Sequence, residues 1–196
     1  SKKMDAIINA TKNESVGSLT GVPSWMLVVL NKMLADTGKS NLHELWPNLE
    51  VFFHVGISFT PYAENYNLIT GKKINYFELY NASEGFFGIQ DQLNEKDMLL
   101  LLDNGIFYEF IPMEEFGSEN ARYLTIGEVE VGKNYAMVIT TNGGLWRYII
   151  GDTIKFTSTN PHRIVVTGRT KHHINVFGEE LRIDNAETAL KRACEH

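Results

Sequence analysis

The chain has 196 residues, 43% of them hydrophobic and 21% charged, with a formal net charge of −6 and one cysteine, Cys194. This is the composition of a soluble globular protein, and the acidic balance argues against a nucleic-acid-binding surface. No apolar run approaches the ~20 residues that cross a bilayer, no signal peptide is evident and no internal disulfide can form, so we expect a cytoplasmic protein without a membrane partner.

The first half of the chain predicts helices alternating with strands. Residues 4–10 have a short helical pattern. Residues 21–38 have a longer one, in which Pro23 suits the first turn and Gly38 can end the helix. Residues 49–56 are a short apolar run bounded by turn residues, which is typical of a buried parallel strand.

A second helix and strand follow directly. Residues 60–71 predict a helix with Thr60 as its cap and Gly71 after its end, and residues 73–80 predict the next strand. Strand, helix and strand in this order form a βαβ unit, whose right-handed crossover implies a parallel sheet. The stretch YNASEG, residues 80–85, would then lie just beyond the carboxyl end of a parallel strand, where open α/β sheets bind ligands.

After Phe86 the pattern changes to short strands separated by turn residues. These β-type runs are MLLLLD, GIFYEFIP, TIGEVEVG, YAMVITT, LWRYIIGD, TIKFTST and RIVVTGR. They predict a mostly antiparallel sheet or a distorted barrel after the parallel portion, so the expected fold class is mixed α/β. Residues 168–180 have the polar, glycine-bounded composition of a hinge, and residues 182–196 predict a helix.

Three polar stretches stand out together: YNASEG, LWRYIIGD (residues 145–152) and TGRTKHH (residues 167–173). Each alone has a structural explanation. An Asp after a Gly at a strand end is usually part of a turn. Arg147 and Tyr148 can be one exposed and one packed residue of a strand. Their order and spacing are more specific than any one of them.

Taken together, YNASEG, TTNGGLWRYIIGD and GRTKHHINVFGEEL resemble the adenylate-forming enzymes, which include acyl-CoA ligases and peptide-synthetase adenylation domains. With GVPSWMLVVL, LHELWPNLEVFFHVG and FYEFIP, the chain resembles more closely the auxin-responsive acyl acid–amido synthetases, the indole-3-acetic acid- and jasmonate-amido synthetase-like enzymes. The resemblance extends from about Gly21 to Leu181. It implies that residues 1–168 are the middle-to-late part of the N-terminal adenylation domain, and that residues 169–196 are the hinge and the beginning of the C-terminal cap domain.

The resemblance implies a reaction that uses ATP and Mg²⁺. A carboxylic acid is first adenylated, and the acyl group is then joined to an amino acid through an amide bond. Glu84 would act catalytically by coordinating Mg²⁺, and Ser83 would donate to a phosphate oxygen. Asp152 would accept hydrogen bonds from the ribose hydroxyls, Arg169 would reach the ribose or a phosphate, and the second catalytic residue, Lys171, lies where such enzymes bend between the two steps.

The residues expected to contact the nucleotide are Tyr80, Asn81, Ala82, Ser83, Glu84, Gly85, Phe107, Tyr108, Asp152 and Arg169. Those expected near the acyl group are Trp25, His54, Gly56 and Ser58.

Several of these positions also have a purely structural interpretation. Phe107 or Tyr108 in an apolar strand serves the core as readily as it stacks on adenine. Trp25 has the helical spacing of a core residue. A histidine that ends a buried strand, such as His54, is more often simply hydrogen-bonded than a ligand contact.

Two parts of the family pattern are missing: the Ser/Thr/Gly-rich loop that holds the β- and γ-phosphates, and all but the opening of the cap domain. We therefore expect this chain to be a piece of a longer enzyme and inactive alone. The alternatives are an acyl-CoA ligase, or an inactive nucleotide-binding or structural module of the same fold. The acid, the amine and the oligomeric state stay open.

Overall fold

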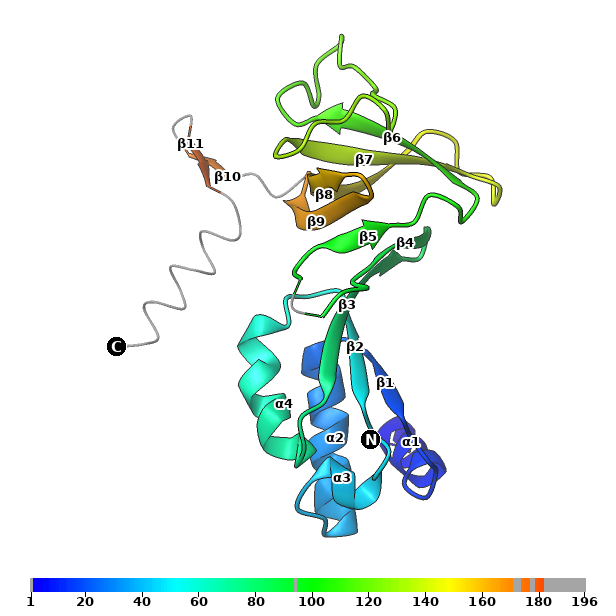
Figure 1. Ribbon diagram of the computed structural model, residues 1–196, viewed down its shortest axis with the longest axis vertical. Coiled ribbons are helices and arrows are strands. Elements are labelled where there is room, and N and C mark those ends of the chain that lie inside the picture. Colours follow the sequence, from blue (N-terminus) through cyan, green and yellow to red (C-terminus); the bar gives the residue numbers. More distant parts are fainter. Residues whose placement is uncertain (1, 94, 171–173, 177–178, 182–196) are drawn as a thin grey trace. The chain divides into compact units, whose positions relative to one another are not determined.

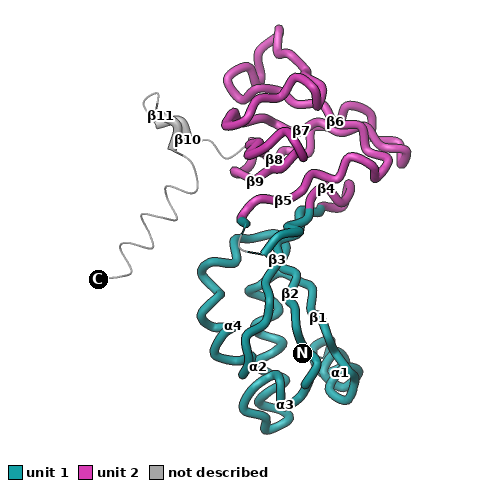
Figure 2. Tube along the Cα trace, in the orientation of Figure 1, with its two compact units in different colours: residues 1–81, 89–95 teal, residues 82–88, 96–196 magenta. Residues whose placement is uncertain are grey.

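The computed structural model describes residues 2–93, 95–170, 174–176 and 179–181. The chain divides into two compact units, the first with residues 1–81 and 89–95, the second with residues 82–88 and 96–196 (Figure 2). Both helices and strands are present, which confirms the predicted mixed α/β class. Within the described ranges, no helix is long and apolar enough to cross a membrane.

The first unit contains a parallel sheet (Figure 1). Its strands, in spatial order, are β1 (Ser18–Gly21), β2 (Val51–Val55) and β3 (Asn75–Ala82). Its helices are α1 (Lys2–Thr11), α2 (Pro23–Thr37), α3 (Leu42–Leu45), the 3₁₀-helix η1 (Thr60–Tyr62) and α4 (Ala63–Thr70). The predicted βαβ unit is confirmed, whereas β1 and α3 were not predicted.

Local chemistry sets both ends of α2. Pro23 occupies its first turn, and Gly38 after its last residue adopts the left-handed conformation with a φ of 65°. Between them Leu30 and Leu34 lie four residues apart on the buried face and join one core cluster with Phe52 of β2. Burial of each such side chain contributes about 1.5–3 kcal/mol.

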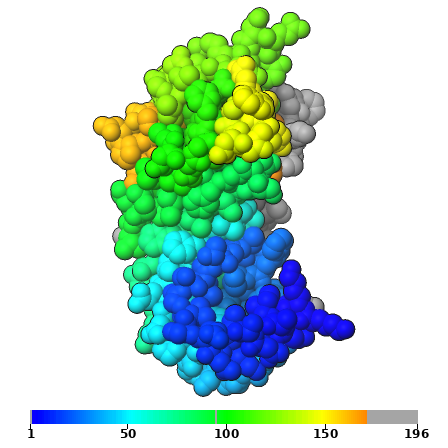
Figure 3. Space-filling view, turned by 90° about the vertical axis from the view of Figure 1, so that its right-hand side faces the viewer, coloured from blue at the N-terminus to red at the C-terminus, as the bar shows by residue number. Residues whose placement is uncertain are grey.

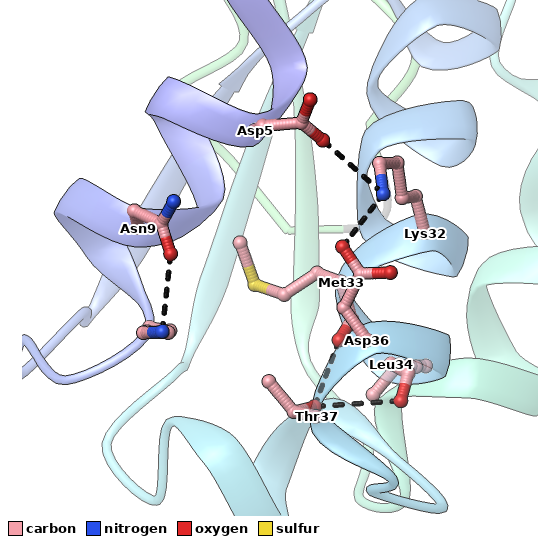
Figure 4. A network of polar contacts seen from close by, with 8 residues as sticks. Asp5, Asn9, Lys32, Met33, Leu34, Asp36 and Thr37 are labelled. Atoms are coloured by element: carbon pink, nitrogen blue, oxygen red, sulfur yellow. Dashed lines mark hydrogen bonds and ion pairs between the residues drawn. The ribbon is translucent and has the colours of Figure 1, made fainter. Parts of the chain in front are cut away.

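An exposed polar network joins α1 and α2 (Figure 4). Nζ of Lys32 lies 3.2 Å from Oδ1 of Asp5 and 2.7 Å from Oδ2 of Asp36. The hydroxyl of Thr37 donates to the carbonyl of Met33 at 2.8 Å. Because these charges face solvent, the apolar cluster, to which α1 adds the buried Ile8, holds the two helices together.

Thr60 is not the helix cap that the sequence predicts. It lies inside η1, where the preceding residue is Phe59 and no side chain caps the turn. Phe59 instead packs its ring against those of His54 and Tyr76, at centroid distances of 4.7 and 4.5 Å. Packing of the Phe59 ring, rather than a cap by Thr60, therefore sets how the chain enters η1. Gly71 ends α4 as predicted.

The second unit is an antiparallel sheet. Its strands lie in the order β4-β5-β9-β8-β7-β6, and β5 to β6 pair antiparallel along this order. The bounds are β4 Gly85–Ile89, β5 Met98–Leu100, β6 Ile106–Pro112, β7 Asn134–Thr141, β8 Tyr148–Thr159 and β9 His162–Arg169. In the described part of the chain this order does not close on itself, so the sheet alternative of the prediction holds and the barrel does not.

Two expected strands differ from the structure. LWRYIIGD and TIKFTST belong to one strand, β8, rather than two. Residues 125–132, TIGEVEVG, form turns and bends instead of a strand. There the backbone N–H and the hydroxyl of Thr125 both donate to Oε2 of Glu128 at 2.7 Å, and such a side-chain turn competes with strand pairing.

Beyond β9, two short strands, β10 (Ile174–Val176) and β11 (Glu179–Leu181), pair antiparallel. The helix predicted for residues 182–196 lies outside the described residues.

Candidate active site

YNASEG is mostly strand rather than loop. Tyr80 to Ala82 are the last residues of β3, and β4 begins at Gly85, so only Ser83 and Glu84 form the turn. The expectation that the whole stretch lies beyond the strand is therefore wrong. Side chains alternate across β3, which buries Tyr80 and exposes Asn81.

Gly85 is required by a close approach. A Cβ at this position would lie 2.9 Å from both Ile106 and Phe87, which is closer than packed side chains allow. The glycine therefore allows β4 to begin at the residue after Glu84 while its backbone packs closely against Ile106 and Phe87.

Glu84 borders a hollow in the second unit. The hydroxyl of Tyr148, the first residue of β8, donates to Oε1 of Glu84 at 3.3 Å. The hollow has a volume of about 390 Å³. Its lining residues are Glu84, Gly85, Phe86, Asn104, Ile106, Thr141, Asn142 and Gly143. The predicted metal and phosphate ligand thus faces a space with amide and hydroxyl donors.

A second hollow, of about 490 Å³, adjoins the first and shares Ile106, Thr141 and Asn142 with it. Its other lining residues are Gly105, Phe107, Thr140, Gly144 and Trp146. Both hollows border residues 142–147, the β7–β8 connection, which Figure 3 draws in yellow at the surface of the second unit. Aromatic surface is available here, because Trp146 is 80% exposed.

Phe107 and Tyr108 were alternatives for a stacking role, and their surroundings differ. Tyr108 is 4% exposed, its hydroxyl donates to the carbonyl of Leu101 at 3.0 Å, and burial raises its pKa. Phe107 is 58% exposed and lines the larger hollow. Tyr108 is a core residue, and Phe107 alone of the two can contact a ligand.

Asp152 and Arg169 form a pair. They are register partners on β8 and β9, and Nε of Arg169 lies 3.2 Å from Oδ1 of Asp152. Asp152 follows Gly151, which has a φ of 90°, a backbone conformation that glycine adopts with little steric strain. Tyr148 and Asp152 lie four residues apart on one strand, which places their Cα atoms at most about 14 Å apart.

The expected acyl-site residues lie in the first unit. His54, in β2, is 6% exposed and stacks on Phe59 with an interplanar angle of 13°. Its Nδ1 has no hydrogen-bond partner, and burial lowers its pKa to about 4. The expectation of an ordinary hydrogen-bonded histidine is thus wrong for Nδ1. Gly56 follows β2 with a φ of 82°, and Ser58 is exposed.

Trp25 is 74% exposed at the start of α2, so its interpretation as a core residue is wrong, and its predicted contact with the acyl group stays a prediction. Lys171 lies outside the described residues. Sequence reasoning missed Tyr148 as a partner of Glu84, because that contact joins positions 64 residues apart. It also missed Glu109, whose carboxylate accepts two hydrogen bonds from Arg147.

Residues 99–169, which cover most of the second unit, match the model of the GH3 family central domain. The resemblance expected from the sequence is confirmed over these residues. The chain is 33% identical over 125 residues to the indole-3-acetic acid-amido synthetase GH3.3 of Arabidopsis thaliana, covering 58% of this chain and 20% of that protein. It is 32% identical over 126 residues to the jasmonoyl–L-amino acid synthetase GH3.5 of Oryza sativa subsp. japonica, covering 57% and 22%. The chain thus spans about a fifth of the length of these GH3 relatives.

Solved structures share the fold. An acyl acid amido synthetase, AtGH3.15 in complex with 2,4-DB, superposes with a TM-score of 0.75 at 17% identity, covering 97% of this chain and 42% of that one. A 2-hydroxyisobutyryl-CoA ligase in complex with 2-HIB-AMP and CoA gives a TM-score of 0.68 at 16% identity, covering 96% and 44%. The fold of this chain is therefore the one seen in these two enzymes.

Proposed function

We propose that this chain is part of an ATP-dependent acyl acid–amido synthetase, which adenylates a carboxylic acid and joins the acyl group to an amino acid. The observation that carries the proposal is the position of Glu84 at a hollow in the same unit as the GH3 match. The ion pair of Asp152 and Arg169 in that unit supports it further.

Glu84 fits the role of a magnesium ligand. Mg²⁺ in nucleotide sites commonly takes one or two carboxylates, with phosphate and water oxygens completing its shell. Among the described residues no three His, Cys, Asp or Glu side chains gather as a metal site, so a single carboxylate beside the nucleotide phosphates is what this region can supply. When bound, the ion would neutralise charge on the phosphates.

The proposed chemistry has two displacements. A carboxylate oxygen of the acid attacks the α-phosphorus of ATP, the bond to the bridging oxygen breaks, and pyrophosphate leaves. The amino group of the amino acid then attacks the acyl carbon, loses a proton, and AMP leaves. In this scheme Ser83 donates to a phosphate oxygen, Asp152 accepts from the ribose hydroxyls, and Arg169, which pairs with Asp152, reaches the ribose or a phosphate.

The remaining expectations belong to the same proposal. Residues 1–168 would be part of the adenylation domain, and residues 169–196, with Lys171, the hinge and the beginning of the cap domain. Phe107 would stack on adenine, while Trp25, His54, Gly56 and Ser58 would border the acyl group. The single cysteine supports a reducing compartment such as the cytoplasm, and the net charge of −6 argues against a nucleic-acid partner.

The test is ATP–pyrophosphate exchange by the full-length protein with a panel of aryl and aliphatic acids. Acid-dependent exchange should vanish in Glu84→Ala and persist in Glu130→Ala, a matched control whose carboxylate pairs with Lys133 on the surface of the same unit. Asp152→Ala should weaken ATP binding by about 2 kcal/mol, the scale of hydrogen bonds to a charged group. Undiminished exchange in Glu84→Ala would exclude the magnesium role. No exchange with any acid would favour a binding module.

An acyl-CoA ligase is the second candidate, since the chain shares its fold with the 2-hydroxyisobutyryl-CoA ligase. The two candidates differ only in the second nucleophile. Mass spectrometry of the products formed with CoA or with a mixture of amino acids separates them: an amide supports the amido synthetase, and a thioester supports the ligase.

A further inference from the structure

Arg147 has an unusual backbone conformation next to the candidate site. Its φ is 45°, and among the described residues every other position with positive φ is a glycine. The left-handed region is unfavourable for a residue with a Cβ, so surrounding contacts must hold the chain there. Arg147 immediately precedes Tyr148, the partner of Glu84.

Glu109 supplies the strongest of these contacts. Its carboxylate, on β6, accepts hydrogen bonds from Nε and Nη2 of Arg147, both at 2.9 Å. This two-point geometry fixes the plane of the guanidinium as well as its position. The guanidinium also lies 4.1 Å from the ring centroid of Tyr123, and the backbone N–H of Arg147 donates to the hydroxyl of Thr140 at 3.0 Å.

The conformation of Arg147 affects the side chains on either side of it. In a regular strand, residues two apart point to the same face. A left-handed residue between Trp146 and Tyr148 interrupts this alternation. Trp146 then lines the larger hollow, while Tyr148 reaches Glu84 at the smaller one.

We propose that Glu109 is a positioning residue. By holding Arg147 in the left-handed conformation, it directs the Tyr148 hydroxyl to Glu84 and Trp146 to the neighbouring hollow. The consequence for catalysis rests on the proposed function, in which Glu84 binds Mg²⁺. The consequence for the geometry of the 142–147 connection does not.

The geometry is tested by ¹⁹F NMR of the full-length protein labelled with 5-fluorotryptophan. Glu109→Gln should shift the resonance of Trp146, assigned with Trp146→Phe, and leave those of Trp25 and Trp46 in place, which also shows that the variant folds. Glu130→Gln, which weakens a surface ion pair of the same unit, should shift none of them. An unmoved Trp146 resonance in Glu109→Gln would overturn the proposal, whatever the protein catalyses.

The catalytic consequence is tested by the Mg²⁺ dependence of ATP–pyrophosphate exchange. Glu109→Gln should raise the half-saturating Mg²⁺ concentration about tenfold, the lower range for loss of a group that orients a metal ligand, and Tyr148→Phe should do the same. In an Arg147→Gly background the effect of Glu109→Gln should shrink to less than about twofold, because glycine adopts positive φ unaided.

The double-variant comparison shows whether Glu109 acts through Arg147. An equal effect of Glu109→Gln in both backgrounds would contradict the proposal, because Glu109 would then act by a route that does not involve the ion pair with Arg147. If wild type shows no exchange with any acid while the Trp146 resonance still shifts in Glu109→Gln, the proposed function fails and the positioning role of Glu109 stands.

Discussion

Burial of His54 should make the first unit less stable in mild acid. The side chain is 6% exposed, and burial lowers its pKa from 6.5 to about 4. The folded state therefore keeps His54 neutral at pH values where the unfolded chain binds a proton. The free energy of unfolding is unaffected by the titration of His54 above pH 6.5. It decreases as the pH falls from 6.5 toward about 4, and His54 contributes no further change below that pH.

The size of this effect follows from the shift. At about 1.4 kcal/mol per pKa unit, the whole interval corresponds to about 3 kcal/mol. The linkage relation gives a loss of about 2 kcal/mol between pH 8 and pH 5. His54→Leu removes both the titration and the unpartnered Nδ1. The variant should match wild type within about 1 kcal/mol at pH 8 and exceed it by about 2 kcal/mol at pH 5.

The assay is native-state hydrogen exchange of peptides that cover β2, at pH 5 and pH 8, corrected for the intrinsic exchange rates. Comparison with the variant is needed because Glu78, the register partner of His54 on β3, responds in the opposite direction. Burial raises the pKa of Glu78, so protonation of its carboxyl in mild acid favours the folded state. The difference between wild type and His54→Leu cancels this contribution.

His43 provides the matched control. Its two ring nitrogens contact the backbone carbonyls of Thr70 and Leu49, the latter at 2.8 Å. His43→Leu should therefore destabilise the unit at pH 8, by about 1–3 kcal/mol, because at least one of these carbonyls loses its hydrogen-bond donor. A stability difference between wild type and His54→Leu that stays constant from pH 8 to pH 5 would refute the reasoning about His54.

Two further substitutions test the packing of each unit. Asp97→Asn should destabilise the second unit by about 2 kcal/mol, seen as a lower urea midpoint, because the buried Arg163 guanidinium, 3.1 Å from Oδ1 of Asp97, loses a charge-assisted hydrogen bond to that carboxylate. A midpoint within error of wild type would contradict this. Gly71→Ala should lower the hydrogen-exchange protection of α4 by about 2 kcal/mol, because the φ of 78° is left-handed and the new Cβ would collide with Asn41, the cap of α3. Unchanged protection would contradict this and show that the turn relaxes around the new side chain.

Local signals predicted the first unit well because single residues decide its element ends. Pro23 and Gly38 place α2 correctly, and Gly71 places the end of α4. The prediction that Thr60 caps a helix was wrong because the ring of Phe59 packs on His54. This packing outweighs the preference of Thr60 for the cap position. The strand predicted for residues 125–132 was wrong because the alternating sequence pattern does not reveal the local turn. In that turn the carboxylate of Glu128 accepts hydrogen bonds from the backbone N–H and the hydroxyl of Thr125.

The candidate site divides in the same way. Motif order predicted Glu84, Asp152 and Arg169 as site residues, and the structure pairs the last two. Tyr148 and Glu109 escaped notice because their contacts join residues 64 and 38 positions apart, and nothing in the local sequence marks such pairs. Glycines and an arginine beside a strand indicated a turn, but not which side chains the turn would bring together.

Tyr148 and Asp152, the two β8 residues that contact other site residues, each follow a residue in the left-handed backbone conformation. Tyr148 follows Arg147, with a φ of 45°, and Asp152 follows Gly151, with a φ of 90°. Each left-handed residue changes the direction of the side chain after it, toward Glu84 in one case and Arg169 in the other. Gly151 adopts this conformation without support. Arg147 cannot, so it needs Glu109, and the ion pair then ties β6 to the start of β8 where a glycine would leave the connection loose. This difference explains why a charged residue stands at position 147 of a turn that already contains two glycines.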